Sequence, residues 1–316
     1  MPSIRNLILL LVSVLASFSN CITVFFDDGS YSCNPRPDNA TTAAFKTNLN
    51  SLLSALEEKA PDSYGFYAAA AGENPDRLYG LAQCRGDVSA PDCASCVKDS
   101  VRWATRSCNN SNEAAVWLDR CYLRYSDGNF LGQWNGSRIA LTPINMSTTD
   151  DPSVAAKGRN FMSLLAADAP NQPFLFEAGS VDVGERGRRY GLVQCNRDLS
   201  VAGCRNCTAG LFKFYFDGEK RNQSSYRLFS YGCRMRYDSY KFYFNYTLPS
   251  DPPQGMSAAS ATSTTISRSK TASEQLRCGN SSDDDALASV FKFINLGLQK
   301  CRAYRAAVGD RHNRHS

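Results

Sequence analysis

The sequence predicts an α+β fold made of two tandem, disulfide-stapled domains. Residues 79–96 read YGLAQCRGDVSAPDCASC and residues 190–207 read YGLVQCNRDLSVAGCRNC, so the spacing C-x8-C-x2-C occurs twice, 111 positions apart. In each copy a helical pattern precedes this motif, and stretches rich in aromatic and β-branched residues follow it. A length of 316 residues accommodates two such domains with a segment left over.

Two helices are expected in the first repeat. In FKTNLNSLLSAL, apolar residues from Phe45 to Leu56 recur on one helical face. A second helix is expected to begin near Asp92, a good N-cap residue, and to continue to Cys108. The second repeat begins near residue 140, and its GRNFMSLLAADAP corresponds to LNSLLSALEEKAP in the first.

Strands are expected after the helices. AAVWLDRCYLRYS is rich in aromatic and β-branched residues, and DSYKFYFNYTL alternates aromatic residues with Lys241, Tyr243 and Asn245. A period of two predicts half-buried antiparallel strands.

The first 20 residues are expected to be a cleaved secretory signal peptide. Arg5 precedes an apolar run of about twelve residues, which is too short for a membrane-spanning helix. No other segment reaches spanning length, so we expect a soluble, secreted protein without a membrane span. Eight N-x-S/T sequons suit a secreted glycoprotein. They are Asn39, Asn109, Asn135, Asn145, Asn206, Asn222, Asn245 and Asn280.

Composition disfavours several classes of function. The net charge is +5, but Arg5 and the last 49 residues carry most of it, so a basic nucleic-acid-binding face is not expected. The only histidines, His312 and His315, lie at the end of the chain, and no phosphate loop or distinctive carboxylate pair is present. We therefore expect no catalytic residues and no cofactor.

The C-terminal region differs in composition from the repeats. Residues 249–274 are rich in Ser, Thr and Ala and are expected to form a flexible linker. Residues 275–316 form a tail in which apolar residues from Leu287 to Cys301 recur on one face of an amphipathic helix. This helix could pack on the preceding domain, on a partner or on a membrane surface.

The cysteines are expected to form disulfides, because the chain has the features of a secreted protein. The second repeat lacks counterparts of Cys33 and Cys108, and their joint absence indicates that these two form a bridge. The four cysteines shared by each repeat allow three pairings. Cys278 and Cys301 can pair with each other, and Cys21 lies at the signal boundary. A zinc site is disfavoured because only one close C-x2-C pair occurs per repeat.

With CYLRYSD and CRMRYDS after the motifs, residues 30 to 248 resemble two copies of the ginkbilobin-homologous domain of land plants. Such tandem copies occur in cysteine-rich repeat secretory proteins and in the ectodomains of cysteine-rich receptor-like kinases. The resemblance implies domains at 30–135 and 140–248, each with two helices packed on a roughly five-stranded antiparallel sheet. It also implies the bridges Cys33–Cys108, Cys84–Cys93, Cys96–Cys121, Cys195–Cys204 and Cys207–Cys233. The linker and tail depart from the receptor pattern, so the secretory branch is the nearer match.

The resemblance also implies where a mannose site would lie. The family's seed antifungal member binds mannose through an Asn after the first cysteine, an Arg before the last and an acid after it. The first repeat matches only at Asn34, since Ala115 and Ser126 occupy the other positions. Asn34 can instead serve as a turn residue.

The second repeat matches this mannose site in part. Arg227 and Asp238 match the Arg and acid positions, and the Asn position falls near Asn145 or Met146. Arg227 and Asp238 can also form a cross-strand surface ion pair.

Tryptophans can stack on sugars or pack in the core. Trp103 and Trp117 lie on a helical and a strand pattern and are expected in the core, whereas Trp134 is expected to be more exposed.

The expected function is that of a secreted, non-enzymatic protein of the extracellular space (apoplast) in plant defence or stress signalling. Its partner would be a cell-wall or microbial carbohydrate or the ectodomain of a receptor-like kinase. A mannose-binding antifungal lectin and a receptor-ectodomain interaction module are the alternatives.

Overall fold

The computed structural model describes residues 22–26, 29–35, 41–108, 111–134, 136, 140–142, 148–217, 222–245 and 264–266. All of them belong to one unit, Met1–Arg268. The expected signal peptide and C-terminal tail lie outside the described residues, as do Cys21, Cys278 and Cys301.

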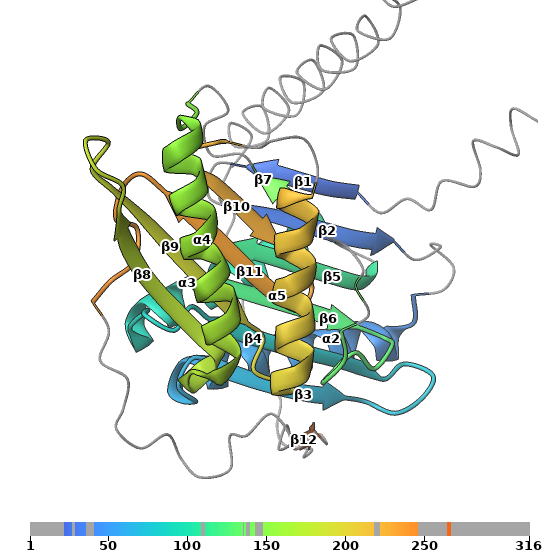
Figure 1. The fold of residues 1–316 in the computed structure, drawn as a ribbon. Coiled ribbons are helices and arrows are strands. Elements are labelled where there is room, and N and C mark those ends of the chain that lie inside the picture. The colour runs from blue at the N-terminus through green and yellow to red at the C-terminus, as the bar shows by residue number, and fades with distance from the viewer. Residues whose placement is uncertain are drawn as a thin grey trace, which may run out of the picture. The chain divides into compact units, whose positions relative to one another are not determined.

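Both repeats contain two long helices and a set of short strands (Figure 1). The first comprises β1 (Ile22–Phe26), β2 (Gly29–Pro35), α2 (Ala43–Asp62), β3 (Phe66–Ala71), β4 (Leu78–Cys84), α3 (Ala90–Ser107), β5 (Ser111–Leu118) and β6 (Cys121–Ser126). The second comprises β7 (Ala140–Thr142), α4 (Pro152–Asp168), the 3-10 turns η2 (Ala169–Asn171) and η3 (Pro173–Leu175), β8 (Phe176–Asp182), β9 (Arg188–Cys195), α5 (Val201–Phe216), β10 (Tyr226–Phe229) and β11 (Cys233–Asp238). A last strand, β12 (Thr264–Ile266), follows.

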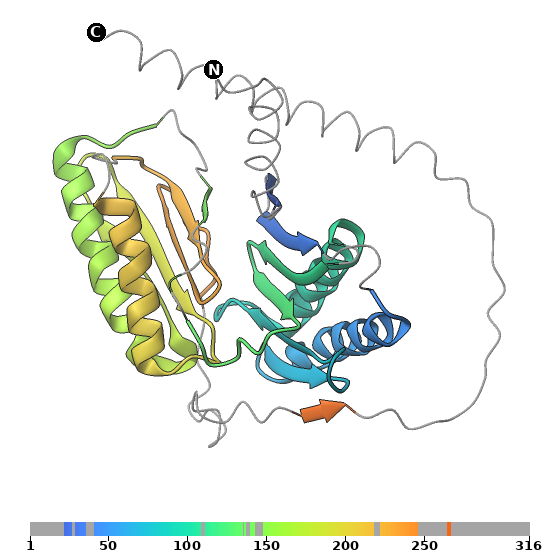
Figure 2. The same ribbon diagram turned by 90° about the vertical axis from the view of Figure 1, so that its right-hand side faces the viewer.

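Each repeat forms one sheet, and two helices cover one face of it (Figure 2). The second sheet has five antiparallel strands in the order β7-β10-β11-β9-β8. The first has the order β1-β2-β5-β6-β4-β3-β12, in which only the β12–β3 pair is parallel. The five antiparallel strands β2, β5, β6, β4 and β3 form the centre of this sheet. Strand β1 lies at one edge, and β12, which falls in the expected linker, lies at the other. The predicted α+β fold of two tandem domains is confirmed.

The helices begin at side chains that accept hydrogen bonds from the first helical turn, as is typical of N-caps. The Thr42 hydroxyl accepts from the Phe45 amide and the Ser200 hydroxyl from the Gly203 amide. The expectation that Asp92 caps the second helix is wrong. Ser89 is the cap, and Asp92 lies in the first turn, where its own amide donates to the Ser89 hydroxyl.

Strand β5 is buried on both faces, which explains its uninterrupted apolar run. Ala114 and Val116 face the core under the helices, whereas Ala115 and Trp117 belong to a second apolar cluster. That cluster includes Phe229 and Tyr231 of the second repeat, so the two sheets meet through the faces that their helices leave uncovered.

Within the described residues five disulfides are present, and each joins a pair that the resemblance implies: Cys33–Cys108, Cys84–Cys93, Cys96–Cys121, Cys195–Cys204 and Cys207–Cys233. Every bridge links a strand to a helix or to the residue that caps it. Each described cysteine is therefore oxidised, and none is available as a thiolate ligand for zinc.

The strand predicted for DSYKFYFNYTL is wrong beyond its first residue. Strand β11 ends at Asp238, and the described residues from 239 to 245 form no strand. The reason lies in the first repeat, whose Arg85 and Asp87 bind this backbone: Arg85 donates to the Phe242 carbonyl, and the Phe244 amide donates to Asp87.

Candidate binding surface at the junction of the two repeats

Two glutamines of the duplicated motif connect the repeats. The Gln83 amide nitrogen donates to the Cys195 carbonyl at 2.8 Å, and the Gln194 amide nitrogen donates to the Cys84 carbonyl at 3.2 Å. The Gln83 side-chain oxygen also accepts from the Arg197 amide at 2.7 Å. Each repeat thus donates a hydrogen bond to the backbone carbonyl of the other's first motif cysteine.

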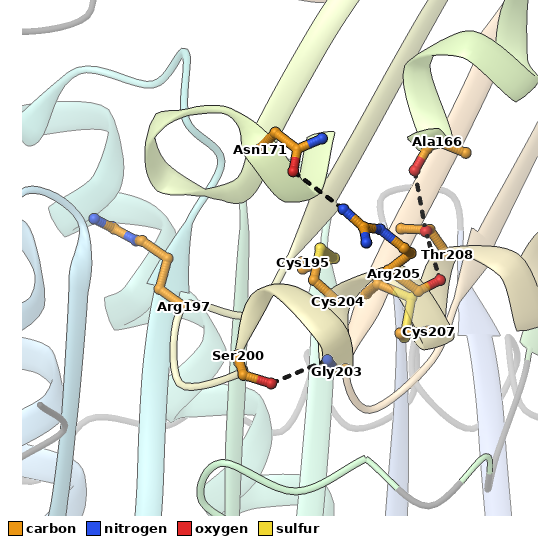
Figure 3. The surroundings of a disulfide bond; sticks show 12 residues. Ala166, Asn171, Cys195, Arg197, Ser200, Gly203, Cys204, Arg205, Cys207 and Thr208 are labelled. Atoms are coloured by element: carbon orange, nitrogen blue, oxygen red, sulfur yellow. Dashed lines mark hydrogen bonds between the residues drawn. A yellow bond between two sulfur atoms is a disulfide. The ribbon is translucent and has the colours of Figure 1, made fainter. Parts of the chain in front are cut away.

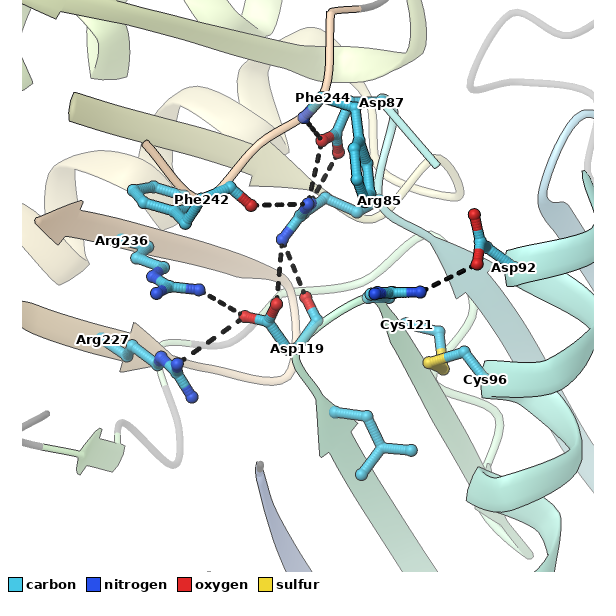
Figure 4. Close-up of polar contacts among 12 residues, drawn as sticks. Arg85, Asp87, Asp92, Cys96, Asp119, Cys121, Arg227, Arg236, Phe242 and Phe244 are labelled. Atoms are coloured by element: carbon cyan, nitrogen blue, oxygen red, sulfur yellow. Dashed lines mark hydrogen bonds and ion pairs between the residues drawn. A yellow bond between two sulfur atoms is a disulfide. The ribbon is translucent and has the colours of Figure 1, made fainter. Parts of the chain in front are cut away.

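Asp119, in the turn between β5 and β6, is the centre of a second connection (Figure 4). Its carboxylate lies 3.2 Å from Arg85 Nη1, 2.7 Å from Arg236 Nη1 and 3.9 Å from Arg227 Nη2. Its backbone carbonyl accepts from Arg234 Nη2 at 2.7 Å. One carboxylate of the first repeat therefore faces Arg85 of its own repeat and two arginines of the second, Arg227 and Arg236.

The pKa values reflect this arrangement. Burial raises the pKa of Asp119, but the surrounding arginines, Arg85 first among them, outweigh it and leave the pKa below its usual value. Burial lowers the pKa of Arg234 to about 9, with Asp119 opposing that shift. Ion pairing within the scaffold accounts for these shifts, so they do not by themselves mark an acid–base catalyst.

Two further buried carboxylates complete this network. Arg85 and Asp87 form a pair with N–O distances of 2.6 and 2.9 Å, and both side chains are buried. Asp238 accepts from Arg236 at 3.1 Å and from the Ser225 hydroxyl at 2.7 Å. Buried charges that are paired and hydrogen-bonded in this way form a fixed structural network.

The structure places Arg227 and Asp238, the two predicted sugar residues of the second repeat, among the charged groups of the junction. The β10–β11 register sets Arg227 opposite Arg236, and its guanidinium faces Asp119. Asp238 is fully buried and already accepts from Ser225 and Arg236. Both side chains hold the scaffold together at the junction.

The other two predicted sugar residues are Asn34 and Asn145. Asn34 is half-buried on β2, opposite Glu113 of β5. It is part of a strand, so the expectation of a turn residue is wrong. Asn145 lies outside the described residues.

The tryptophans differ in part from expectation. Trp117 is buried, but in the cluster between the repeats. Trp103 is 38% exposed and stacks on Tyr31, with ring centroids 5.7 Å apart. Trp134, expected to be exposed, is half-buried against Gly210 and Gly232, where an added Cβ would lie 2.9 and 2.7 Å from the indole.

Three of the eight sequons fall within the described residues. Asn206, on α5, and Asn245 are exposed, and Asn222 is half-buried.

The sequence interpretation missed Gln83, Gln194 and Asp119. The two glutamines left a signal, because a polar residue precedes the first motif cysteine in both copies at the end of an otherwise apolar strand. Asp119 left none, because its partners are distant in sequence and, apart from Arg85, belong to the other repeat.

Comparisons with known proteins agree with this architecture. A family model described as salt stress response/antifungal matches residues 32–128 and 146–240. Cysteine-rich repeat secretory protein 38 of Arabidopsis thaliana is 35% identical over 207 residues, which cover 63% of this chain and 78% of that protein. Antimicrobial ginkbilobin-2-like protein of Castanea crenata is 31% identical over 237 residues, which cover 74% of this chain and 94% of that protein.

Receptor proteins match over the same region. Cysteine-rich receptor-like protein kinase 29 of Arabidopsis thaliana is 31% identical over 236 residues, which cover 72% of this chain but 34% of the kinase. The tandem DUF26 ectodomain of the Arabidopsis thaliana cysteine-rich receptor-like protein PDLP8 shares the fold, with a TM-score of 0.56 and 24% identity over 69% of this chain and 98% of that chain. In the part of the chain that the structure describes, no helix is long and apolar enough to cross a membrane.

Proposed function

Since the chain belongs to the salt stress response/antifungal family, we propose that it is a secreted, non-enzymatic binding protein of plant defence or stress signalling. Its ligand is an extracellular carbohydrate from a cell wall or a microbe. Cleavage after residue 20 releases the protein, and the exposed Asn206 and Asn245 carry N-glycans.

One observation carries this proposal: the charged groups at the junction bind one another. Asp119, Arg85 and Arg236 hold the two repeats, each with its own disulfides, together as one platform. Such a platform suits recognition through its outer surface, and its perturbed pKa values have structural causes. The ligand therefore binds away from Arg227 and Asp238.

A glycan array probed with the secreted protein, its N-glycans trimmed, tests the proposal. The comparison variant is Arg227→Lys, which keeps the charge at the junction. We expect selective glycan binding that both proteins share, with equal melting temperatures. Mannose-selective binding that is lost in Arg227→Lys at an unchanged melting temperature would instead support the mannose-binding lectin.

A second candidate is a receptor-ectodomain interaction module, favoured by the match to kinase 29 and to a tandem ectodomain. Surface plasmon resonance against immobilised ectodomains of this family tests it. Ectodomain binding together with a blank array would favour this module, whereas no binding in either assay would refute the proposed binding function.

A further inference from the structure

The loops that follow the first helix of each repeat meet in an exposed aromatic stack. Tyr64 and Phe174 occupy equivalent positions, both with positive φ, 53° and 59°. Their rings are stacked with centroids 6.4 Å apart, and Tyr64 is 51% exposed. Positive φ at bulky residues is strained and tends to occur at functional sites, where the surroundings hold it in place.

Arg197 packs against this stack. Its guanidinium carbon lies 4.6 Å from the ring centroid of Phe174 and 5.2 Å from that of Phe66, and Nη2 donates to the Tyr64 carbonyl. Figure 3 shows Arg197 pointing away from Arg205, which is bound by Asn171.

The guanidinium of Arg197 lacks an acidic partner. Its Nε and Nη1 atoms are buried and find no acceptor among the described residues, and no carboxylate of these residues pairs with it. Burial lowers its pKa to about 9, so it remains charged at neutral and acidic pH. A charged group with unused donors strongly favours an incoming anion.

The other repeat shows that the fold does not require an arginine here. QCRGD aligns with QCNRD, so Gly86 is the counterpart of Arg197. At Gly86 the ring of Phe176 packs directly on the backbone, where an added Cβ would lie 2.6 Å from Phe176. Phe66, the counterpart of Phe176, contacts Arg197 instead. The arginine is thus present in the second repeat alone.

These features together specify the chemistry of a ligand. A guanidinium binds a carboxylate through a planar two-bond contact, and an aromatic face packs against a rigid ring. A uronate, a sugar ring that carries a carboxylate, supplies both, whereas an acidic peptide side chain supplies only the carboxylate. We propose that Tyr64, Phe66, Phe174 and Arg197 form a binding site for a uronate residue of an acidic polysaccharide.

This inference rests on the proposed carbohydrate-binding function and names its ligand class. The carboxylate would accept from the Arg197 donors that lack a protein acceptor, and the exposed Tyr64 ring would pack against the sugar ring.

Isothermal titration calorimetry with an oligomer of galacturonate and its methyl ester of equal length tests the site. The ester retains the sugar and removes the charge, so this comparison needs no variant. We expect the ester to bind at least about tenfold more weakly, since a hydrogen bond to a charged group contributes roughly 1.5–3 kcal/mol.

Two variants locate the site. Arg197→Gln should weaken binding of the unesterified oligomer by about tenfold or more. Tyr64→Asn should also weaken it while preserving the backbone, because asparagine tolerates positive φ. Arg102→Gln is the matched control, since Arg102 is an exposed arginine on α3, and should bind as the wild type does. Melting temperatures for each variant verify folding.

Three results would overturn the inference: equal binding of the ester, wild-type affinity in Arg197→Gln and Tyr64→Asn, or equal affinity for a glutamate oligomer. If the galacturonate oligomer does not bind but other glycans on the array do, the uronate site is refuted and the proposed function stands. Absence of all glycan and ectodomain binding would refute both.

Discussion

Replacing Asp119 by asparagine should destabilise the protein more than any exposed charge substitution. The change removes the carboxylate that Arg85 and Arg236 contact and that Arg227 faces at 3.9 Å. Asparagine keeps the size and the backbone carbonyl but presents amide hydrogens toward the arginines. The buried positive charges of the two repeats would then repel one another across the junction.

The magnitude follows from the burial of the partners. Removing one member of a buried ion pair costs about 3–5 kcal/mol. The Asp119 side chain is 29% exposed, so solvent screening places the loss near the lower end, about 3 kcal/mol. For a folded region of this size, that loss corresponds to a decrease in melting temperature of roughly 6–12 °C.

Calorimetric melting of the wild type, Asp119→Asn and Asp92→Asn is the assay. Asp92 is the matched control, because it pairs with Arg120 at 2.8 Å but the side chains are 43% and 46% exposed. Its loss should cost no more than about 1 kcal/mol. Equal melting temperatures for Asp119→Asn and Asp92→Asn would refute the assignment of Asp119 as the central charge of the junction.

The pH dependence gives a second readout. The folded-state pKa of Asp119 is lowered, so its contribution to stability is present above the unfolded value of about 3.9 and is lost as pH falls below it. The difference in melting temperature between wild type and Asp119→Asn should therefore shrink below about pH 4. A difference that stays constant down to about pH 2 would contradict this.

Two further predictions concern the same junction. Burial raises the pKa of Asp198 to about 6, so its contribution to stability is present below about pH 4 and is lost as pH rises through 6. Asp198→Asn keeps an acceptor for the Gly132 amide, so the variant should gain stability relative to wild type as pH rises from about 4 to 8. Thermal melts measure this, and an equal difference in melting temperature at both pH values would contradict it. Gln83→Leu should lower the free energy of unfolding by about 1 kcal/mol more than Gln194→Leu, because Gln83 makes two hydrogen bonds across the junction and Gln194 makes one. Chemical denaturation measures both variants, and equal decreases would refute the second hydrogen bond of Gln83 as a contribution to stability.

Local patterns predicted the helices and some of the strands within each repeat. Apolar periodicity located the helices, and the duplicated cysteine spacing located the repeats. The joint absence of two cysteines from the second repeat indicated the Cys33–Cys108 pair, which the structure also contains. These inferences concern contacts within one repeat, which are visible in its own pattern or in its comparison with the other copy.

Inferences about the junction needed information that periodicity lacks. DSYKFYFNYTL has the alternation of a strand, yet its backbone binds Arg85 and Asp87 of the other repeat. Arg227 and Asp238 share a hairpin, but register alone decides that Arg227 lies opposite Arg236. A pattern within one segment does not reveal which distant segment satisfies its polar groups.

A duplicated scaffold separates what serves the fold from what serves recognition. Positions that are alike in both copies, such as Gln83 and Gln194, make equivalent contacts, so a structural role explains their recurrence. Gly86 and Arg197 occupy equivalent positions in the two repeats, but their side chains and contacts differ. The glycine packs closely beneath a ring, whereas the arginine leaves two buried donors without a protein acceptor. Because the first copy shows that the fold forms without it, the unpaired charge of Arg197 is better explained by a ligand than by packing.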